Sequence, residues 1–143
     1  MHKFKQLVSS LIKSDNNNSL LNNASPEFCA RLVTIKNENV LNKLLVKIKA
    51  SNTDWIVKFM KENGFFEILN SIENICDRQN ISIFYKSILL SKYLQCIELL
   101  MNKKVGMEFI IDMAENKECI QILSKGEAKL SIYMKKFNLI LEL

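Results

Sequence analysis

The chain has 143 residues, a formal net charge of +5, 48% hydrophobic residues and 24% charged residues, a balance that excludes general disorder and suits one domain. Three glycines and one proline are too few for a many-turned β sandwich. No apolar run reaches the roughly 18 residues that a membrane span needs. With the β sandwich and the membrane span both excluded, we expect a largely helical fold.

The first predicted element is a short amphipathic helix, whose apolar residues have helical spacing. These residues are Phe4, Leu7, Val8, Leu11 and Ile12. The polar, Asn-rich stretch at 14–25 follows and predicts a flexible linker. We therefore assign residues 1–24 to the N-terminal helix and linker and residues 25–143 to the folded module. The pattern leaves open whether the first helix packs on that module.

Apolar stripes with helical spacing continue through the rest of the chain. They predict helices near 26–35, 40–48, 55–60, 65–75, 81–101, 107–111, 119–123 and 130–141. Ser25 is a predicted N-cap and Pro26 suits a first helical position, while Asn52 or Thr53 caps the helix that contains Trp55. Trp55 and Phe59, four residues apart, are expected in the core.

Glycine marks the predicted breaks between several of these helices. Gly64 is expected to end a helix in the left-handed conformation, Gly106 to lie in a short turn, and Lys125-Gly126 to interrupt the last part of the chain. A short helix, a glycine and two longer helices occur around 55–101 and again around 107–143. This arrangement is similar to armadillo-like units of roughly 40 to 47 residues.

The fold class that follows is all-α: an armadillo-like α-solenoid of about two to three repeats with an extra N-terminal helix. The run at 81–101 is apolar on more than one side and is therefore predicted to be a central helix. The last predicted helix is still apolar at Leu143, which predicts a truncated solenoid or a partner that covers this end.

Convergent polar residues that would indicate catalysis are not evident in the sequence. His2 is the single histidine, which argues against a histidine-based triad or metal site, and three isolated glycines cannot build a phosphate-binding loop. The four cysteines lack paired CxxC spacing and are expected to be mostly buried free thiols in a reducing cytosol. These cysteines are Cys29, Cys76, Cys96 and Cys119. We predict a protein that is not an enzyme and has no cofactor and no metal.

The positive charge is spread along the chain and does not form one block. It predicts a solvated basic surface, and nucleic-acid binding is not favoured. The alternative function, from another class, is a helical-repeat scaffold that binds nucleic acid or an anionic surface through its lysines.

Three segments stand out in order along the chain: Ser25–Leu32, Asp54–Phe65 and Cys96–Ile110. Together, in register, they resemble the regulatory domain of inverted-formin-type formins. Ser25–Leu32 (SPEFCARL) resembles the family's S/D-P-E-L-C-x-R-L element. Asp54–Phe65 (DWIVKFMKENGF) is similar to its W-[MV]-x-x-F-L-x-x-x-G-L signature. Cys96–Ile110 (CIELLMNKKVGMEFI) resembles its C-[VL]-[RK]-A-[VF]-M-N-x-x-x-G-[IL]-x-x-[IM] element.

That resemblance implies an armadillo-repeat module, the diaphanous inhibitory domain within the formin homology 3 region. In this family the module binds an amphipathic inhibitory helix from the formin's own C-terminus and restrains actin nucleation and elongation, and in diaphanous-type members a Rho-family GTPase competes with that helix. The resemblance thus implies an indirect effect on actin and a cytoplasmic, cytoskeleton-associated location.

The resemblance also implies where partners bind. The third helices of the repeats correspond to Ser87–Asn102 and Leu130–Leu143, and the implied partner-binding residues are Asn102, Lys103, Asn138, Leu141 and Glu142. Leu141 and Glu142 stand where the family has small alanines. For Asn102 a structural role is equally compatible, because it can cap its helix or hold the turn at 103–106.

Overall fold

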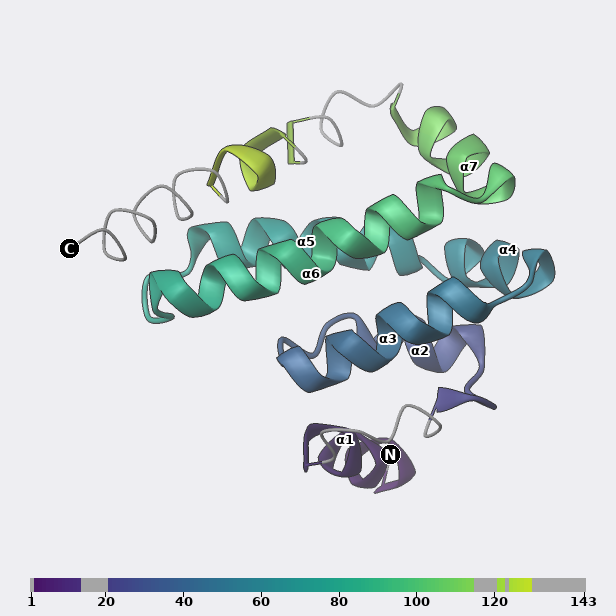
Figure 1. The fold of residues 1–143 in the computed structure, drawn as a ribbon, viewed down its shortest axis with the longest axis horizontal. Helices are drawn as coiled ribbons and strands as arrows, with labels where there is room; N and C mark the ends of the chain where they lie inside the picture. The colour runs from purple at the N-terminus through teal and green to yellow at the C-terminus, as the bar shows by residue number, and fades with distance from the viewer. Residues whose placement is uncertain (1, 14–20, 115–120, 123, 130–143) are drawn as a thin grey trace.

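The computed structural model describes residues 2–13, 21–114, 121–122 and 124–129, and every regular element within these ranges is a helix (Figure 1). The helices are α1 (His2–Lys13), α2 (Pro26–Leu32), α3 (Glu38–Ala50), α4 (Thr53–Lys61), α5 (Gly64–Asp77), α6 (Ile83–Met101) and α7 (Lys104–Ala114). Residues 124–129 are also helical. The predicted all-α fold is confirmed.

Side-chain caps determine where four of the helices begin. The Oγ of Ser25 accepts a hydrogen bond from the amide of Phe28 at 3.1 Å, and Pro26 occupies the first position of α2. The side chains of Asn37, Asn52 and Ser82 accept corresponding amide hydrogen bonds at the starts of α3, α4 and α6. Each cap satisfies an amide that the first turn leaves without a helical partner. The predicted caps at Ser25 and Asn52 are confirmed.

The predicted break at Asn63-Gly64 is present between α4 and α5, but the residue with the left-handed conformation differs from the prediction. Asn63, and not Gly64, has the left-handed conformation, with φ of 65°. Gly64 instead begins α5, where a Cβ would lie 2.5 Å from the ring of Phe59. Asparagine tolerates the left-handed conformation better than most residues, so the glycine is free to serve the close packing.

The other two predicted glycine breaks are wrong. Gly106 lies inside α7, and a Cβ there would lie 2.0 Å from the carbonyl oxygen of Leu100 at the end of α6. Lys125 and Gly126 are both helical, and a Cβ on Gly126 would meet a methyl group of Ile72 at 2.7 Å. These glycines therefore permit close approach between helices and do not interrupt them.

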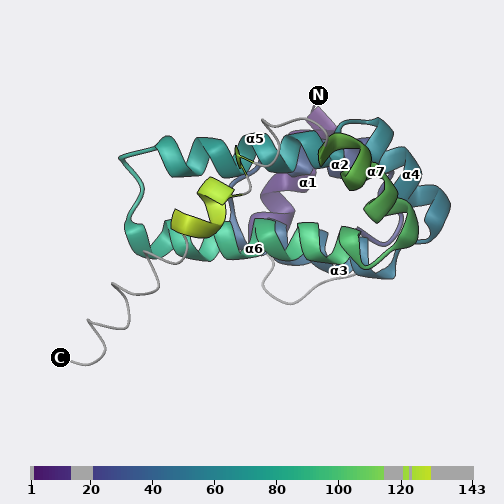
Figure 2. The ribbon, with the colours of Figure 1, turned by 90° about the horizontal axis from the view of Figure 1, so that it is seen from above.

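The helices form a stack in which each layer repeats the arrangement of the previous one. Figure 2 shows α6 and α3 along one side of the molecule, α5 and α2 along the other, and α4 and α7 at one end. The helices of each pair contact each other, and α6 also packs against α5 and α7. This layered arrangement of short and long helices is armadillo-like, as predicted, and α6 is the expected central helix.

One hydrophobic core joins α2 to α7. Tyr93 of α6 is fully buried and donates a hydrogen bond from its hydroxyl group to the carbonyl oxygen of Val33 at 2.6 Å. Ser71 of α5 donates to the same carbonyl at 3.4 Å. This carbonyl follows α2, so the two bonds hold three helices together without leaving a buried polar atom unpaired.

Three of the four cysteines lie in this core as buried free thiols, as predicted: Cys29, Cys76 and Cys96. Cys119 lies outside the described residues. Burial raises the pKa of the Cys29 thiol to about 12, although Lys47 opposes the shift, and burial raises the pKa of Cys96 to about 12. The neutral thiol is thus the form that the folded state favours.

Alkaline pH is therefore expected to destabilise the fold. Below the ordinary thiol pKa of 9.0, Cys29 and Cys96 make their full contribution to the free energy of unfolding. This contribution is lost as the pH rises from 9.0 toward their folded pKa values near 12. We expect the urea midpoint to fall between about pH 8 and about pH 10.5. The urea midpoint of the Cys96→Ala variant should fall less steeply over the same pH interval. An equally steep fall would contradict the assignment of the pH dependence to the buried thiols.

The helix α1 packs against α3, which answers the question that the sequence pattern left open. Leu21, placed by the sequence in the linker, is fully buried together with Leu11, Leu32 and Val40. The described part of the predicted linker is therefore packed against the module. Among the described helices, none has the length and apolar character needed to cross a bilayer.

Candidate functional site

The surface between α3 and α6 is hollowed into a groove of about 300 Å³. Its lining residues are Leu45, Val46, Lys49, Gln95, Glu98, Leu99 and Asn102. Gln95, Glu98 and Leu99 of α6 and its C-cap Asn102 follow the spacing i, i+3, i+4 and i+7, which places them along one face of that helix. We call this hollow the α3–α6 groove.

The α3–α6 groove combines apolar and charged lining residues. Leu45 and Leu99 are half-buried against the core, and Val46 is 42% exposed. Lys49 and Glu98, both exposed, supply charges of opposite sign among its lining residues. An exposed apolar strip between charges suits the apolar face of another protein, with ionic contacts that orient it.

Asn102 lies at one end of this groove and also ends α6. Its backbone amide donates to the carbonyl oxygen of Glu98 at 3.0 Å, so the residue is the C-cap of the helix. Its side chain is exposed and lines the groove. The capping role and a contact role are therefore compatible in this one residue.

Lys103, the next residue, joins the two helices that form the groove. Its ammonium group donates to the carbonyl oxygen of Ser51 at 3.0 Å and to that of Lys49 at 3.4 Å. Both acceptors lie at the C-terminal end of α3, where carbonyls lack helical partners and a positive charge is stabilising. Lys103 thereby holds the end of α3 next to the start of α7.

The groove continues across α3 toward the N-terminal part of the chain. A smaller hollow of about 170 Å³ is lined by Leu21, Asn22, Val46, Lys47 and Ala50, so Val46 belongs to both. Lys47 donates to the carbonyl oxygen of Asn22 at 2.8 Å and lies 5.5 Å from the ring centre of Trp55. An extended ligand could therefore contact α6, α3 and the segment at 21–22 together.

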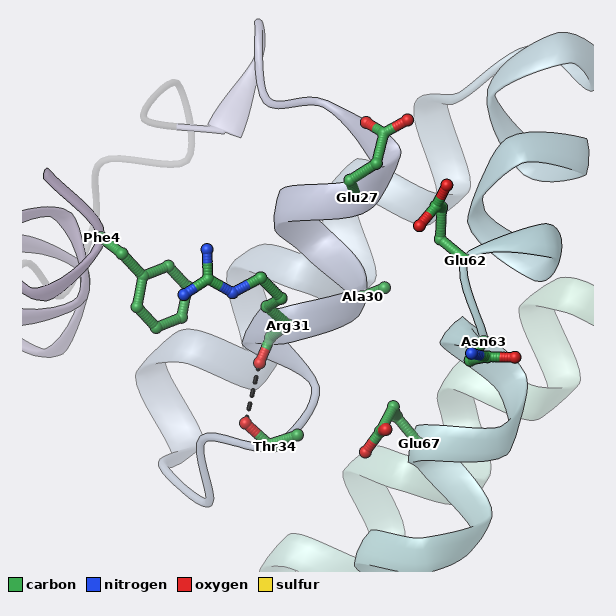
Figure 3. Close-up of a pocket in the computed structure, with 8 residues that line it drawn as sticks. All are labelled: Phe4, Glu27, Ala30, Arg31, Thr34, Glu62, Asn63 and Glu67. Carbon is green, nitrogen blue, oxygen red and sulfur yellow. Dashed lines mark hydrogen bonds between the residues drawn. The ribbon is translucent and has the colours of Figure 1, made fainter. Parts of the chain in front are cut away.

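A third hollow, of about 360 Å³, lies between α2 and the junction of α4 and α5 and is mainly acidic. Figure 3 shows Glu27 on α2 on one side of it and Glu62 and Glu67 on the other. At its edge the guanidinium of Arg31 lies 4.1 Å from the ring centre of Phe4. This hollow differs in charge from the α3–α6 groove, in which one Lys and one Glu balance.

Comparison with known families identifies the chain. A family model described as the Diaphanous GTPase-binding Domain matches residues 2–138. The chain belongs to the diaphanous GTPase-binding domain family. The formin resemblance of the three sequence motifs is confirmed, and the molecule is a formin-type regulatory module.

Individual relatives of this diaphanous GTPase-binding domain are similar at low identity. Inverted formin-2 of Xenopus tropicalis and of Xenopus laevis are each 26% identical over 116 residues, which is 81% of this chain. Formin-H of Dictyostelium discoideum is 31% identical over 72 residues, or 50% of this chain. The matched regions span 8%, 10% and 7% of those proteins. No solved structure matches the chain at comparable significance.

The partner-binding residues implied by the resemblance divide into two groups in this domain. Asn102 and Lys103 lie together at one end of the α3–α6 groove. Asn138, Leu141 and Glu142, and the whole predicted helix Leu130–Leu143, lie outside the described residues. Ser87–Asn102, predicted as a third helix, corresponds to most of α6 with its cap.

Sequence reasoning missed the α3 half of the groove in this domain. Leu45, Val46 and Lys49 were not predicted as site residues, although Leu45 belongs to the apolar stripe of the helix predicted near 40–48. One feature of the sequence could have pointed to Val46 as a site residue, because it is an apolar residue that lies beside that stripe. Nothing in the sequence states which exposed apolar residue faces α6, since that depends on how the helices stack.

Several lysines of the domain are used within the fold. The ammonium groups of Lys43, Lys47, Lys86 and Lys103 each donate to a main-chain carbonyl group of another segment. Part of the positive charge of the chain therefore stabilises helix ends and loops. Within the described ranges, no group of three or more His, Cys, Asp and Glu side chains could hold a metal ion.

Proposed function

We propose that the chain is a non-enzymatic regulatory module of the formin type that binds an amphipathic helix along the α3–α6 groove. The observation that carries this proposal is the exposed apolar strip of Val46 beside Leu45 and Leu99, with Lys49 and Glu98 among the same lining residues. Covering an exposed valine is worth up to about 1.5 kcal/mol, and neighbouring apolar side chains add to it. A helix with an apolar face supplies such a cover.

A Rho-family GTPase is the second proposed partner, and the description of the matched family supports it. Asn102 lines the end of the groove and Lys103 follows it in the turn after α6, so a GTPase that contacts this turn would compete with a helix lying in the groove. Through this competition the module would control actin filament assembly at the cytoskeleton, in the cytoplasm. The relatives named formins support this activity.

The Val46→Asp variant is expected to weaken helix binding at least about tenfold, because a carboxylate in the apolar strip would lose hydration when the apolar face of the helix covers it. The probe is a fluorescein-labelled peptide of the C-terminal amphipathic helix of Inverted formin-2, titrated by fluorescence anisotropy. Val46 is exposed, so the urea midpoint should change little. The matched control is Ile111→Asp, an exposed apolar position on α7.

Unchanged affinity of the Val46→Asp variant would contradict the groove assignment. A salt titration separates the alternative function, since phosphate contacts lose affinity steeply with added salt and apolar docking does not. Titration with GTP-loaded and GDP-loaded Rho-family GTPase then tests the second partner. Competition by the GTP-loaded form alone is the expected result.

A further inference from the structure

The N-terminal helix α1 occupies an apolar groove on α2 and α3. Leu11, Leu21, Leu32 and Val40 are fully buried there and form a cluster separate from the main core. The partly buried side chains of this cluster include Phe4, Leu7 and Val8 of α1. The stripe of α1 at i, i+3, i+4 and i+7 therefore faces this groove, which is how an amphipathic helix binds a protein surface.

Both ends of α1 are recognised by side chains of the groove. Near its start, the ring of Phe4 packs edge-on against Phe28, with ring centres 5.2 Å apart. The same ring lies 4.1 Å from the guanidinium of Arg31 (Figure 3). At its end, Lys43 donates to the carbonyl oxygen of Leu11 at 3.2 Å, and Asn39 donates to that of Ile12 at 2.9 Å. These donors satisfy carbonyls that the last turn leaves open, and the lysine opposes the negative end of the helix dipole.

The helix α1 nevertheless buries fewer side chains than the central helices do. Among residues 3–13, Leu11 is the single fully buried side chain, whereas α5 buries eight residues. The apolar contacts of α1 lie in the separate cluster, so its departure would leave the main core intact. Elements with few buried contacts open at lower free energy than the core.

We propose that the α2–α3 groove is a second helix-binding site, which α1 occupies in the resting chain and yields to an amphipathic helix of a partner protein. The groove selects an aromatic residue at the first position and aliphatic residues three, four and seven positions later, and it binds the C-terminal carbonyls of the helix through Lys43 and Asn39. It uses Asn39, Val40 and Lys43 of α3, whereas the α3–α6 groove uses Leu45, Val46 and Lys49. The proposal therefore stands independently of the proposed function.

The test uses the full chain and a fluorescein-labelled peptide of residues 2–13 as the probe. Leu11→Asp in the chain places a charge in the buried cluster and should release α1. We expect the Leu11→Asp chain to bind the unmodified peptide at least about tenfold more tightly than the unmodified chain does. In the unmodified chain α1 occupies the groove, so only a small fraction of the molecules can bind the peptide. A peptide that itself carries Leu11→Asp should bind neither chain.

Peptide variants test the specificity without disturbing the chain. Phe4→Ala in the peptide should weaken binding, since the ring contacts Phe28 and Arg31 in the structure. Ser9→Ala, at an exposed position of α1, is the matched control and should bind as the unmodified peptide does. Equal binding of the Phe4→Ala and Ser9→Ala peptides would overturn the assigned selectivity.

A Leu11→Asp chain with native circular dichroism that fails to bind the peptide would overturn the proposal. If that chain does not fold, amide hydrogen exchange of the unmodified chain tests whether α1 leaves the groove. Exchange in α1 that is faster than in α5 and α6 supports an exchangeable α1, and exchange at the rate of α5 overturns it. A dimer of the unmodified chain that the peptide dissociates would assign the groove to α1 of a second copy instead.

Discussion

Replacing Phe59 with alanine is expected to lower the free energy of unfolding by about 3–5 kcal/mol, because the truncation leaves a cavity that the surrounding helices cannot fill. Phe59 is fully buried on α4, its ring stacks on Trp55 with centroids 5.3 Å apart, and it lies against Gly64 at the start of α5. Urea denaturation with linear extrapolation measures the change.

The matched control is Phe66→Ala, which removes the same ring from α5 at a position that is 50% exposed. Its effect should be well under half that of Phe59→Ala, because most of the transfer free energy of an exposed ring is not gained on folding. Equal losses at Phe59 and Phe66 would show that the contacts of Phe59 do not stabilise the fold as described.

Phe59, and not Trp55, is the fully buried member of this predicted core pair. The pattern predicts Trp55 and Phe59 together in the core, but Trp55 is half-buried. Its indole nitrogen donates to the carbonyl oxygen of Ala24 at 3.2 Å, and Lys47 lies over its ring. Trp55 thus joins α4 to the segment before α2, while Phe59 fills the interior.

Gly106→Ala is expected to destabilise the protein by about 3 kcal/mol, the upper end of the usual cost of overpacking. The added Cβ would lie 2.0 Å from the carbonyl oxygen of Leu100, and backbone atoms cannot move aside as a flexible side chain can. Alanine is intrinsically favoured over glycine in a helix by about 1 kcal/mol, and this gain is smaller than the clash. The thermal midpoint and the urea midpoint should both fall.

Gly126→Ala is the matched control, since it is the same substitution at another helical glycine. There the added Cβ meets a methyl group of Ile72 at 2.7 Å, and a side-chain terminus can adjust. We expect a loss clearly smaller than that at Gly106. A neutral or stabilising effect of Gly106→Ala would contradict the close approach of α6 and α7.

Local features of this protein are predictable because they depend on neighbours in the chain. Ser25 and Asn52 cap helices wherever those helices are placed, since the accepting oxygen and the donating amide are three residues apart. The apolar stripes of α3 and α5 likewise follow from the helical period. The family resemblance, carried by three motifs at matching separations, also depends on order along the chain and is confirmed.

The errors share a different cause. Gly64 was predicted to adopt the left-handed conformation, and Gly106 and Gly126 were predicted to break helices. Gly64 instead begins α5, the other two lie inside helices, and all three lie against a neighbouring segment. A glycine in a sequence states that a side chain is absent, but it does not state whether the backbone needs a positive φ or a neighbour needs the space. That distinction depends on atoms from residues such as Phe59, Leu100 and Ile72.

The sequence by itself determined the helical character, the caps, the buried thiols and the family of this protein. The tertiary structure alone decided that α1 packs on α3, that Lys103 holds the end of α3, and that Val46 faces a groove beside α6. The reason is physical: helix period and capping are interactions over three or four residues, whereas a groove is formed by surfaces about fifty residues apart, whose register depends on how whole helices stack.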